Sequence, residues 1–159
     1  MSRYLERAEH IARVVDVHLN RLLEMPATSG RQQMHPLLDS LPAGRPIAQE
    51  IGYYERARDL TFDSAHESSL AYCIERAREN ARQIREQISS EMWEQLNQLF
   101  LFVKQPSSLE SWDAEPHQFF QAVKDGSHLF QGIADSTMNH SEGWDFIQVG
   151  RFIERGCSL

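Results

Sequence analysis

The chain lacks most features that mark membrane, secreted and nucleotide-binding proteins. No apolar run approaches the ~20 residues that a membrane-spanning helix needs. Charged residues begin at Arg3, a pattern unlike that of a secretory signal peptide. Only two cysteines, Cys73 and Cys157, occur among 159 residues, without metal-type spacing, which fits free thiols in a reducing compartment. No glycine-rich phosphate loop is present. The composition therefore predicts a cytoplasmic protein with no membrane partner.

The charge balance argues against a nucleic-acid partner. The formal net charge is −7 and the pI is about 5.5, whereas phosphate binding needs clustered, uncompensated Lys and Arg. Most arginines of this chain have a glutamate close by. With 41% hydrophobic and 25% charged residues, the chain has the composition of one globular domain over residues 1–159.

Helical periodicity dominates the first two thirds of the chain. An apolar stripe predicts a helix that ends near residue 25, and a shorter helix is expected over residues 48–61. A proline- and glycine-containing connection, with one helical turn at residues 36–41, separates them. From residue 67 to 104 one stripe continues without Gly or Pro. It predicts one very long central helix of roughly 55 Å, with a possible interruption at Ser89-Ser90.

The last third continues the helical pattern after a break at residues 105–113. A helix is predicted over residues 116–138, with proline in its first turn, and a final helix follows Ser141. No strand pattern occurs. The sequence therefore predicts an all-α protein, built as an antiparallel bundle of about five helices.

One five-residue pattern occurs twice: arginine, aromatic, aliphatic, glutamate, arginine, at residues 3–7 and 151–155. Glu6 and Glu154 are 148 residues apart (154 − 6), far beyond the ~20–50 residue period of solenoids. The repeating unit is therefore domain-sized, and residues 142–159 are expected to open a truncated second repeat. We expect a buried Glu-Arg pair to join the two copies, and more than half exposure of both glutamates would contradict this.

A second charged pattern lies on the predicted long helix, where alternating Glu and Arg allow i,i+3 and i,i+4 pairs. Uncharged amides on the opposite arc favour an inward orientation of this ladder. The alternative, for which the sequence speaks equally, is that the ladder lies on a solvated face. Each pair would then contribute only ~0.3–0.5 kcal/mol to stability. The candidate ligand-binding or structural ion-pair network comprises Glu6, Arg7, Glu79, Arg82, Arg85, Glu86, Glu154 and Arg155.

Patterns for catalysis and metal binding are weak. Glu6 and His10 have i,i+4 spacing, but carboxylate-metal sites in bundles need Glu-x-x-His from two helices, so no metal and no cofactor are expected. Ser89-Ser90 lies near Glu91 but lacks the exposed turn of G-x-S-x-G. The sequence names no catalytic residue and leaves open whether the chain is an enzyme.

Four segments together resemble the Alpha-E family, named for its Glu-Arg motif: residues 3–9, 78–86, 88–97 and 127–144. The resemblance covers nearly the whole chain and implies a bacterial all-helical domain, usually in tandem duplicate. It also implies gene neighbours that encode ATP-grasp and transglutaminase-like proteins, hence a system of peptide synthesis or modification. Family members carry further residues before the first motif, so we expect uncovered apolar surface on the terminal helices and self-association through them.

Three functions are compatible with these observations. An accessory or scaffold protein for an ATP-grasp or transglutaminase-like partner explains abundant ion pairs and the lack of nucleophiles. A ligand-binding or catalytic domain is the alternative, in which Glu79, Arg82, Glu6 and Arg155 line one polar cleft. A metalloprotein ranks third.

Overall fold

The computed structural model describes residues 1–24 and 52–157. All regular elements in these ranges are helical, which confirms the all-α class, and seven α-helices are described where about five were predicted. They are α1 (Ser2–Glu24), α3 (Tyr53–Phe62), α4 (Leu70–Gln83), the 3-10 turn η1 (Arg85–Gln87), α5 (Ser90–Lys104), α6 (Pro106–Ala114), α7 (Pro116–Thr137) and α8 (Glu142–Cys157). The predicted connection over residues 26–46 and its helical turn lie outside the described residues.

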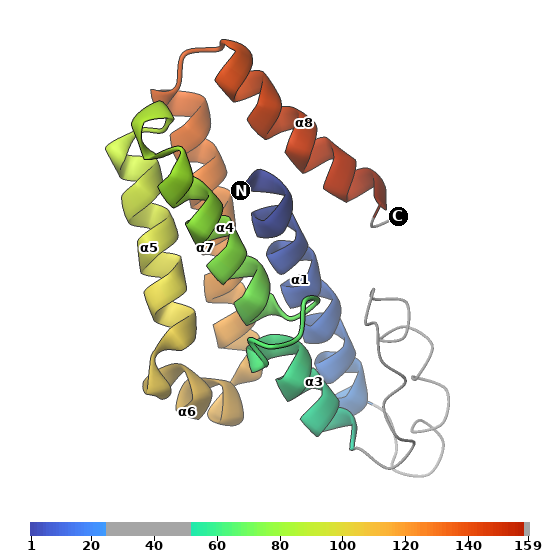
Figure 1. Cartoon of the computed structure of the whole chain (residues 1–159). Coiled ribbons are helices and arrows are strands. Elements are labelled where there is room, and N and C mark those ends of the chain that lie inside the picture. Colours follow the sequence, from blue (N-terminus) through green and yellow to red (C-terminus); the bar gives the residue numbers. More distant parts are fainter. Residues whose placement is uncertain (25–51, 158–159) are drawn as a thin grey trace.

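Four helices surround the main core. α1, α4, α5 and α7 form a closed ring in which each helix packs against two others and runs antiparallel to them (Figure 1). The large side chains that fill this core come from all four helices and from α6. They are Leu5, Ile11, Val15, Leu70, Ile74, Met92, Leu96, Trp112, Phe119, Phe120 and Phe130.

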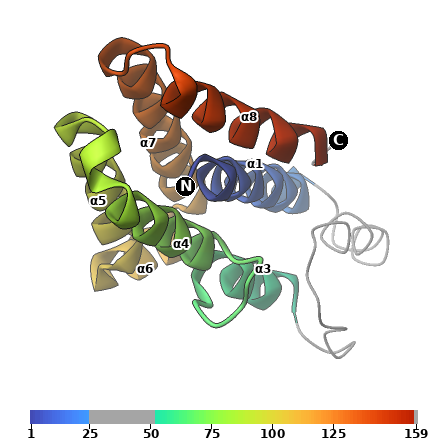
Figure 2. The same ribbon diagram turned by 45° about the horizontal axis from the view of Figure 1, so that its top comes forward.

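α8 lies outside this ring. It packs along the N-terminal part of α1, on the side turned away from α3 and α4 (Figure 2). Gly150 permits a close approach, because a Cβ at this position would lie 2.5 Å from Ser2 Oγ and 3.3 Å from Arg3 Cγ. The side of α1 that the ring leaves open is therefore covered by the last described helix.

The prediction of one very long central helix is wrong. Ile84 and Ile88 leave the helical conformation, with φ/ψ of −114°/28° and −116°/156°. Ser89 Oγ then accepts the backbone N–H of Met92 at 3.1 Å, which caps a new helix. The chain turns back between α4 and α5, so each half of the apolar stripe is buried against the other. One straight helix would leave much of that stripe in water.

The break predicted at residues 105–113 is also wrong, because α6 occupies Pro106–Ala114. Proline stands in its first turn, where no backbone donor is lost. Trp112 is fully buried, with its ring centroid 4.7 Å from that of Tyr54 and 5.8 Å from that of Phe62. This packing stabilises a helix too short to show a clear stripe.

Candidate functional site

α1 also buries acidic side chains outside its apolar stripe. Glu6, Glu9 and Asp16 are each only 4% exposed. Taken alone, α1 places Glu6 almost opposite the apolar stripe, and thus in water. The carboxylate is nevertheless buried, because α7 and α8 cover this side of α1.

Two arginines of α1 bind the carboxylate of Glu154 on α8. Arg7 Nε donates to Glu154 Oε1 at 2.5 Å, and Arg3 Nε donates to Glu154 Oε2 at 3.3 Å. The arginine side chains are 28% and 53% exposed, whereas that of Glu154 is 5% exposed. The hydrogen bond that Arg7 donates to Glu154 is the main cause that raises the pKa of Arg7. Two partly exposed guanidinium groups thus pair with one buried carboxylate.

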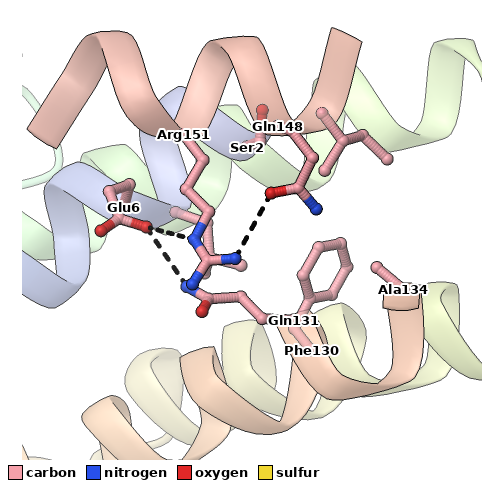
Figure 3. A pocket seen from close by; sticks show the side chains of 9 residues that line it. Ser2, Glu6, Phe130, Gln131, Ala134, Gln148 and Arg151 are labelled. Atoms are coloured by element: carbon pink, nitrogen blue, oxygen red, sulfur yellow. Dashed lines mark hydrogen bonds and ion pairs between the residues drawn. The ribbon is translucent and has the colours of Figure 1, made fainter. Parts of the chain in front are cut away.

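Glu6 receives the corresponding contacts from α8. Arg155 Nε donates to Glu6 Oε1, and Arg151 Nε lies 3.7 Å from Glu6 Oε2. Gln131 of α7 donates to Glu6 Oε2 at 3.2 Å (Figure 3). Arg151 also donates to Gln148 at 3.5 Å, within its own helix.

The two copies of the motif therefore exchange partners. In each copy, the arginine three residues before the glutamate and the arginine just after it contact the glutamate of the other copy. Both glutamates are 4% exposed, so the predicted buried pairing between the copies is confirmed. Breaking a buried ion pair by removing one partner typically costs roughly 3–5 kcal/mol.

Little space remains beside this network. A cavity of about 10 Å³ lies next to Glu6, enough for about one water molecule (Figure 3). It is bordered by Phe130, Gln131 and Arg151 among others. A nucleotide or a peptide could not enter it unless α8 moved away from α1.

Further acidic side chains of α1 face α7. Asp16 Oδ1 lies 2.8 Å from His117 Nδ1, and Asp16 Oδ2 accepts from Lys124 Nζ at 2.8 Å. Glu9 lies 3.5 Å from His128 Nε2. Sequence reasoning missed these contacts. The available signal was the placement of Glu6, Glu9 and Asp16 on one face of the first helix, next to its apolar stripe.

The charged ladder of α4 and η1 lies at the surface. Arg82 binds Glu79 through two hydrogen bonds of 2.8 and 3.0 Å, with side chains 64% and 34% exposed. Hydrogen bonding to Arg82 lowers the pKa of Glu79. Arg85 donates to Ser90 Oγ at 3.2 Å, and Glu86 is exposed. Of the two orientations considered for this ladder, the solvated one therefore holds for the Glu79–Arg82 pair.

Arg78 joins α4 to α5. Its guanidinium carbon lies 5.4 Å from the ring centroid of Trp93 and 4.7 Å from that of Phe100, both on α5. Its Nε donates to Asn97 Oδ1 at 2.6 Å. Cation–π contacts of this kind hold the outer edges of α4 and α5 together.

The predicted site residues thus fall into two sets. Glu6, Arg7, Glu154 and Arg155 meet between α1 and α8, whereas Glu79, Arg82, Arg85 and Glu86 lie on α4 and η1. In residues 1–24 and 52–157, no three His, Cys, Asp or Glu side chains gather closely enough to hold a metal ion. None of the described helices has the length and apolar character to cross a membrane.

The architecture and the two Glu-Arg motifs agree with a known family. The family model of Alpha-E, a predicted alpha-helical domain with a conserved ER motif, matches residues 1–159. Similar chains include the uncharacterized proteins Mb2597 of Mycobacterium bovis and Rv2567 of Mycobacterium tuberculosis, each 28% identical over 179 residues. The match covers 100% of this chain and 20% of each relative, so the chain spans about a fifth of their length. No solved structure matches the chain. The chain belongs to the Alpha-E family.

Proposed function

We propose that this chain is a cytoplasmic accessory or scaffold protein rather than an enzyme. The observation that carries the proposal is the exchange of partners between the two motifs. The motif guanidiniums contact buried glutamates, and the cavity beside Glu6 measures only about 10 Å³. A site that binds substrate needs unpaired polar groups and space. The network instead fixes α8 on α1.

The chain further acts, in this proposal, through its outer helical faces on a protein partner. The Alpha-E resemblance suggests an ATP-grasp or transglutaminase-like protein of a peptide synthesis or modification system. Exposed apolar side chains such as Leu101 of α5 and Leu129 of α7 offer contact area outside the core. Such a partner would bind the assembled bundle without entering it.

We also propose that α8 opens a second repeat of the same kind. The offset of 148 residues (154 − 6) equates Glu154 with Glu6, and the same offset equates the arginines that bind them. The reciprocal contacts support this relation, because two equivalent helices that meet around a local two-fold axis exchange equivalent bonds. Residues 149–159 then correspond to residues 1–11, at the beginning of α1.

Ligand titration separates this proposal from its catalytic alternative. Thermal unfolding of the chain is followed with Mg-ATP, with glutamate and with a glutamine-containing peptide, each added in large excess. We expect no change in Tm, because only about 10 Å³ of space remains beside Glu6 in the Glu-Arg network. A rise in Tm that Arg82→Met or Arg155→Met abolishes would favour the ligand-binding or catalytic function, since specific binding to the native state stabilises it.

A direct binding experiment tests whether the chain binds a protein partner. The purified ATP-grasp or transglutaminase-like protein encoded beside this gene is mixed with the chain, and the complex is sought by sedimentation velocity. Leu101→Glu and Leu129→Glu probe two different faces while the core stays intact. A complex lost in one variant and kept in the other would locate the docking face. Absence of any complex with either protein would contradict the accessory role.

A further inference from the structure

α8 carries an apolar stripe that faces outward. Phe146, Val149, Phe152 and Ile153 are 75%, 53%, 59% and 47% exposed. They lie three to four residues apart, which places them on one face of the helix. Single exposed apolar residues are ordinary, but a continuous stripe of this kind marks an interaction surface.

The repeated motif relates part of this stripe to residues of α1. With the offset of 148 residues, Phe152 and Ile153 correspond to Tyr4 and Leu5 of α1. Leu5 is 2% exposed in the bundle, and the Tyr4 ring meets that of Tyr72 on α4 at 6.5 Å. The residues that α1 buries against another helix therefore have counterparts on α8. Within the described residues, no helix covers these counterparts.

The apolar surface continues beyond the stripe. At the start of α8, Phe146 borders a cleft of about 270 Å³ between the N-terminus of α1, the turn between α4 and α5, and the connection from α7 to α8. Its walls are mostly apolar, and they include Ile84, Ile88 and Met138. A large side chain from a neighbouring molecule would find room there.

The stripe is complementary to itself in an antiparallel arrangement. Glu142 and Asp145 stand in the first turn of α8. Arg155 stands in its last turn, where it pairs with Glu6 and its side chain remains 45% exposed. Two copies of α8 that run in opposite directions and cross at Val149 would place Phe146 opposite Phe152. They would also bring the acidic end of each helix to the basic end of the other.

We propose that the outer face of α8 binds a second copy of this chain, as an antiparallel helix pair centred on Val149. Such a contact is isologous: the same patch serves both copies, and a closed dimer results. Gly156 supports it, because no atom lies within 4 Å of a Cβ at this position and the helices can approach closely there. The inference goes beyond the accessory function, since self-association and partner binding would use different surfaces.

Sedimentation equilibrium of the full chain tests the proposal from low micromolar to several hundred micromolar concentration. Wild type should be dimeric, and Val149→Glu should be monomeric, because two carboxylates would meet at the centre of the interface. Leu101→Glu is the matched control, since Leu101 is 62% exposed on α5, away from α8, and this variant should stay dimeric. Circular dichroism of each variant verifies that the helices have formed.

Cross-linking tests the direction of the helices. A short bismaleimide should link two copies of Val149→Cys/Cys157→Ser, because both thiols lie at the centre of the pair. It should not link wild type through its exposed Cys157, whose two copies stand at opposite ends of an antiparallel pair. Monomers at every concentration would overturn the proposal, as would a dimer that survives Val149→Glu or one that cross-links through Cys157. Sole association with a different helical protein would overturn it too.

Discussion

Arg7 of the first helix donates a 2.5 Å hydrogen bond to Glu154 of the last described helix, across 147 residues of sequence. Arg155 donates to Glu6 in the opposite direction. Charged groups that would be ordinary on a surface helix thus become the contact between two helices. The burial of both glutamates makes this contact dependent on correct pairing, because a carboxylate without its cations is costly inside a protein.

The surface ladder should contribute little to stability. Arg82→Met removes an exposed pair with Glu79, and exposed pairs contribute about 0–1 kcal/mol. Urea titration of wild type and variant should therefore give nearly the same free energy of unfolding. A clear loss of unfolding free energy in Arg82→Met would show that the exposed ladder contributes to stability after all.

The contact between Asp16 and Lys124 should matter more, because both side chains are largely buried, at 6% and 14% exposure. Lys124→Met leaves the carboxylate with the exposed His117 and with the amide of Asn20, which donates to Asp16 Oδ1 at 3.3 Å. Without a buried cation we expect a loss of roughly 3 kcal/mol in urea titration. Lys104→Met is the matched control. Lys104 pairs with a half-exposed Glu75, and its removal should cost about 1 kcal/mol or less. Equal losses in the two variants would contradict this account of Asp16.

Gly150 should be required for the approach of α8 to α1. Alanine normally stabilises a helix interior relative to glycine by about 0.5–1 kcal/mol. Gly132→Ala should show that gain, because no atom lies within 4 Å of the new methyl group. Gly150→Ala should lose it and destabilise the chain, since the methyl group would lie 2.5 Å from Ser2 Oγ and 3.3 Å from Arg3 Cγ. Thermal unfolding of both variants gives the comparison, and a similar gain in each would refute the close contact.

The two cysteines should differ in reactivity. Burial raises the pKa of Cys73 to about 12, whereas Cys157 is exposed. A thiol reagent at neutral pH should modify one cysteine per native chain and two per unfolded chain, because the thiolate is the reactive form.

The same pKa shift predicts a pH dependence of stability. The unfolded thiol loses its proton near pH 9, but the folded thiol keeps it up to about pH 12. The contribution of the neutral Cys73 thiol to stability is therefore fully present below pH 9 and falls by about 1.4 kcal/mol per pH unit above it. Cys73→Ala should lack this slope, so the difference in unfolding free energy between wild type and variant should change with pH above pH 9. An identical slope in wild type and variant would contradict the shift.

Sequence reasoning worked where a helix has a long stripe and a clear boundary. α7 agrees with the predicted residues 116–138, and α8 begins just after Ser141. The possible interruption at Ser89-Ser90 coincides with the start of α5. The reversal of the chain before it was not predicted, because an unbroken stripe without Gly or Pro does not indicate that the chain folds back on itself. Sequence reasoning also missed α6, whose nine residues bury only Ser108 and Trp112.

The site shows the same division. The repeated motif predicted that the glutamate of one copy pairs with an arginine of the other, although α1 considered alone places Glu6 in solvent. The contact of Asp16 with Lys124 was not predicted, because it depends on the register between α1 and α7. Register between antiparallel helices is set by the packing of the whole core, and no local pattern of this chain encodes it.

The central claim is that Glu154 and Arg7 stabilise the chain as a pair. A double-mutant cycle with Arg7→Met and Glu154→Gln measures this directly, through the free energy of unfolding of the four proteins. We predict a favourable coupling energy above about 1.5 kcal/mol, with the larger single loss in Arg7→Met, which leaves a buried carboxylate with half-exposed Arg3. A coupling energy near zero would contradict the claim, because the two side chains would then contribute independently.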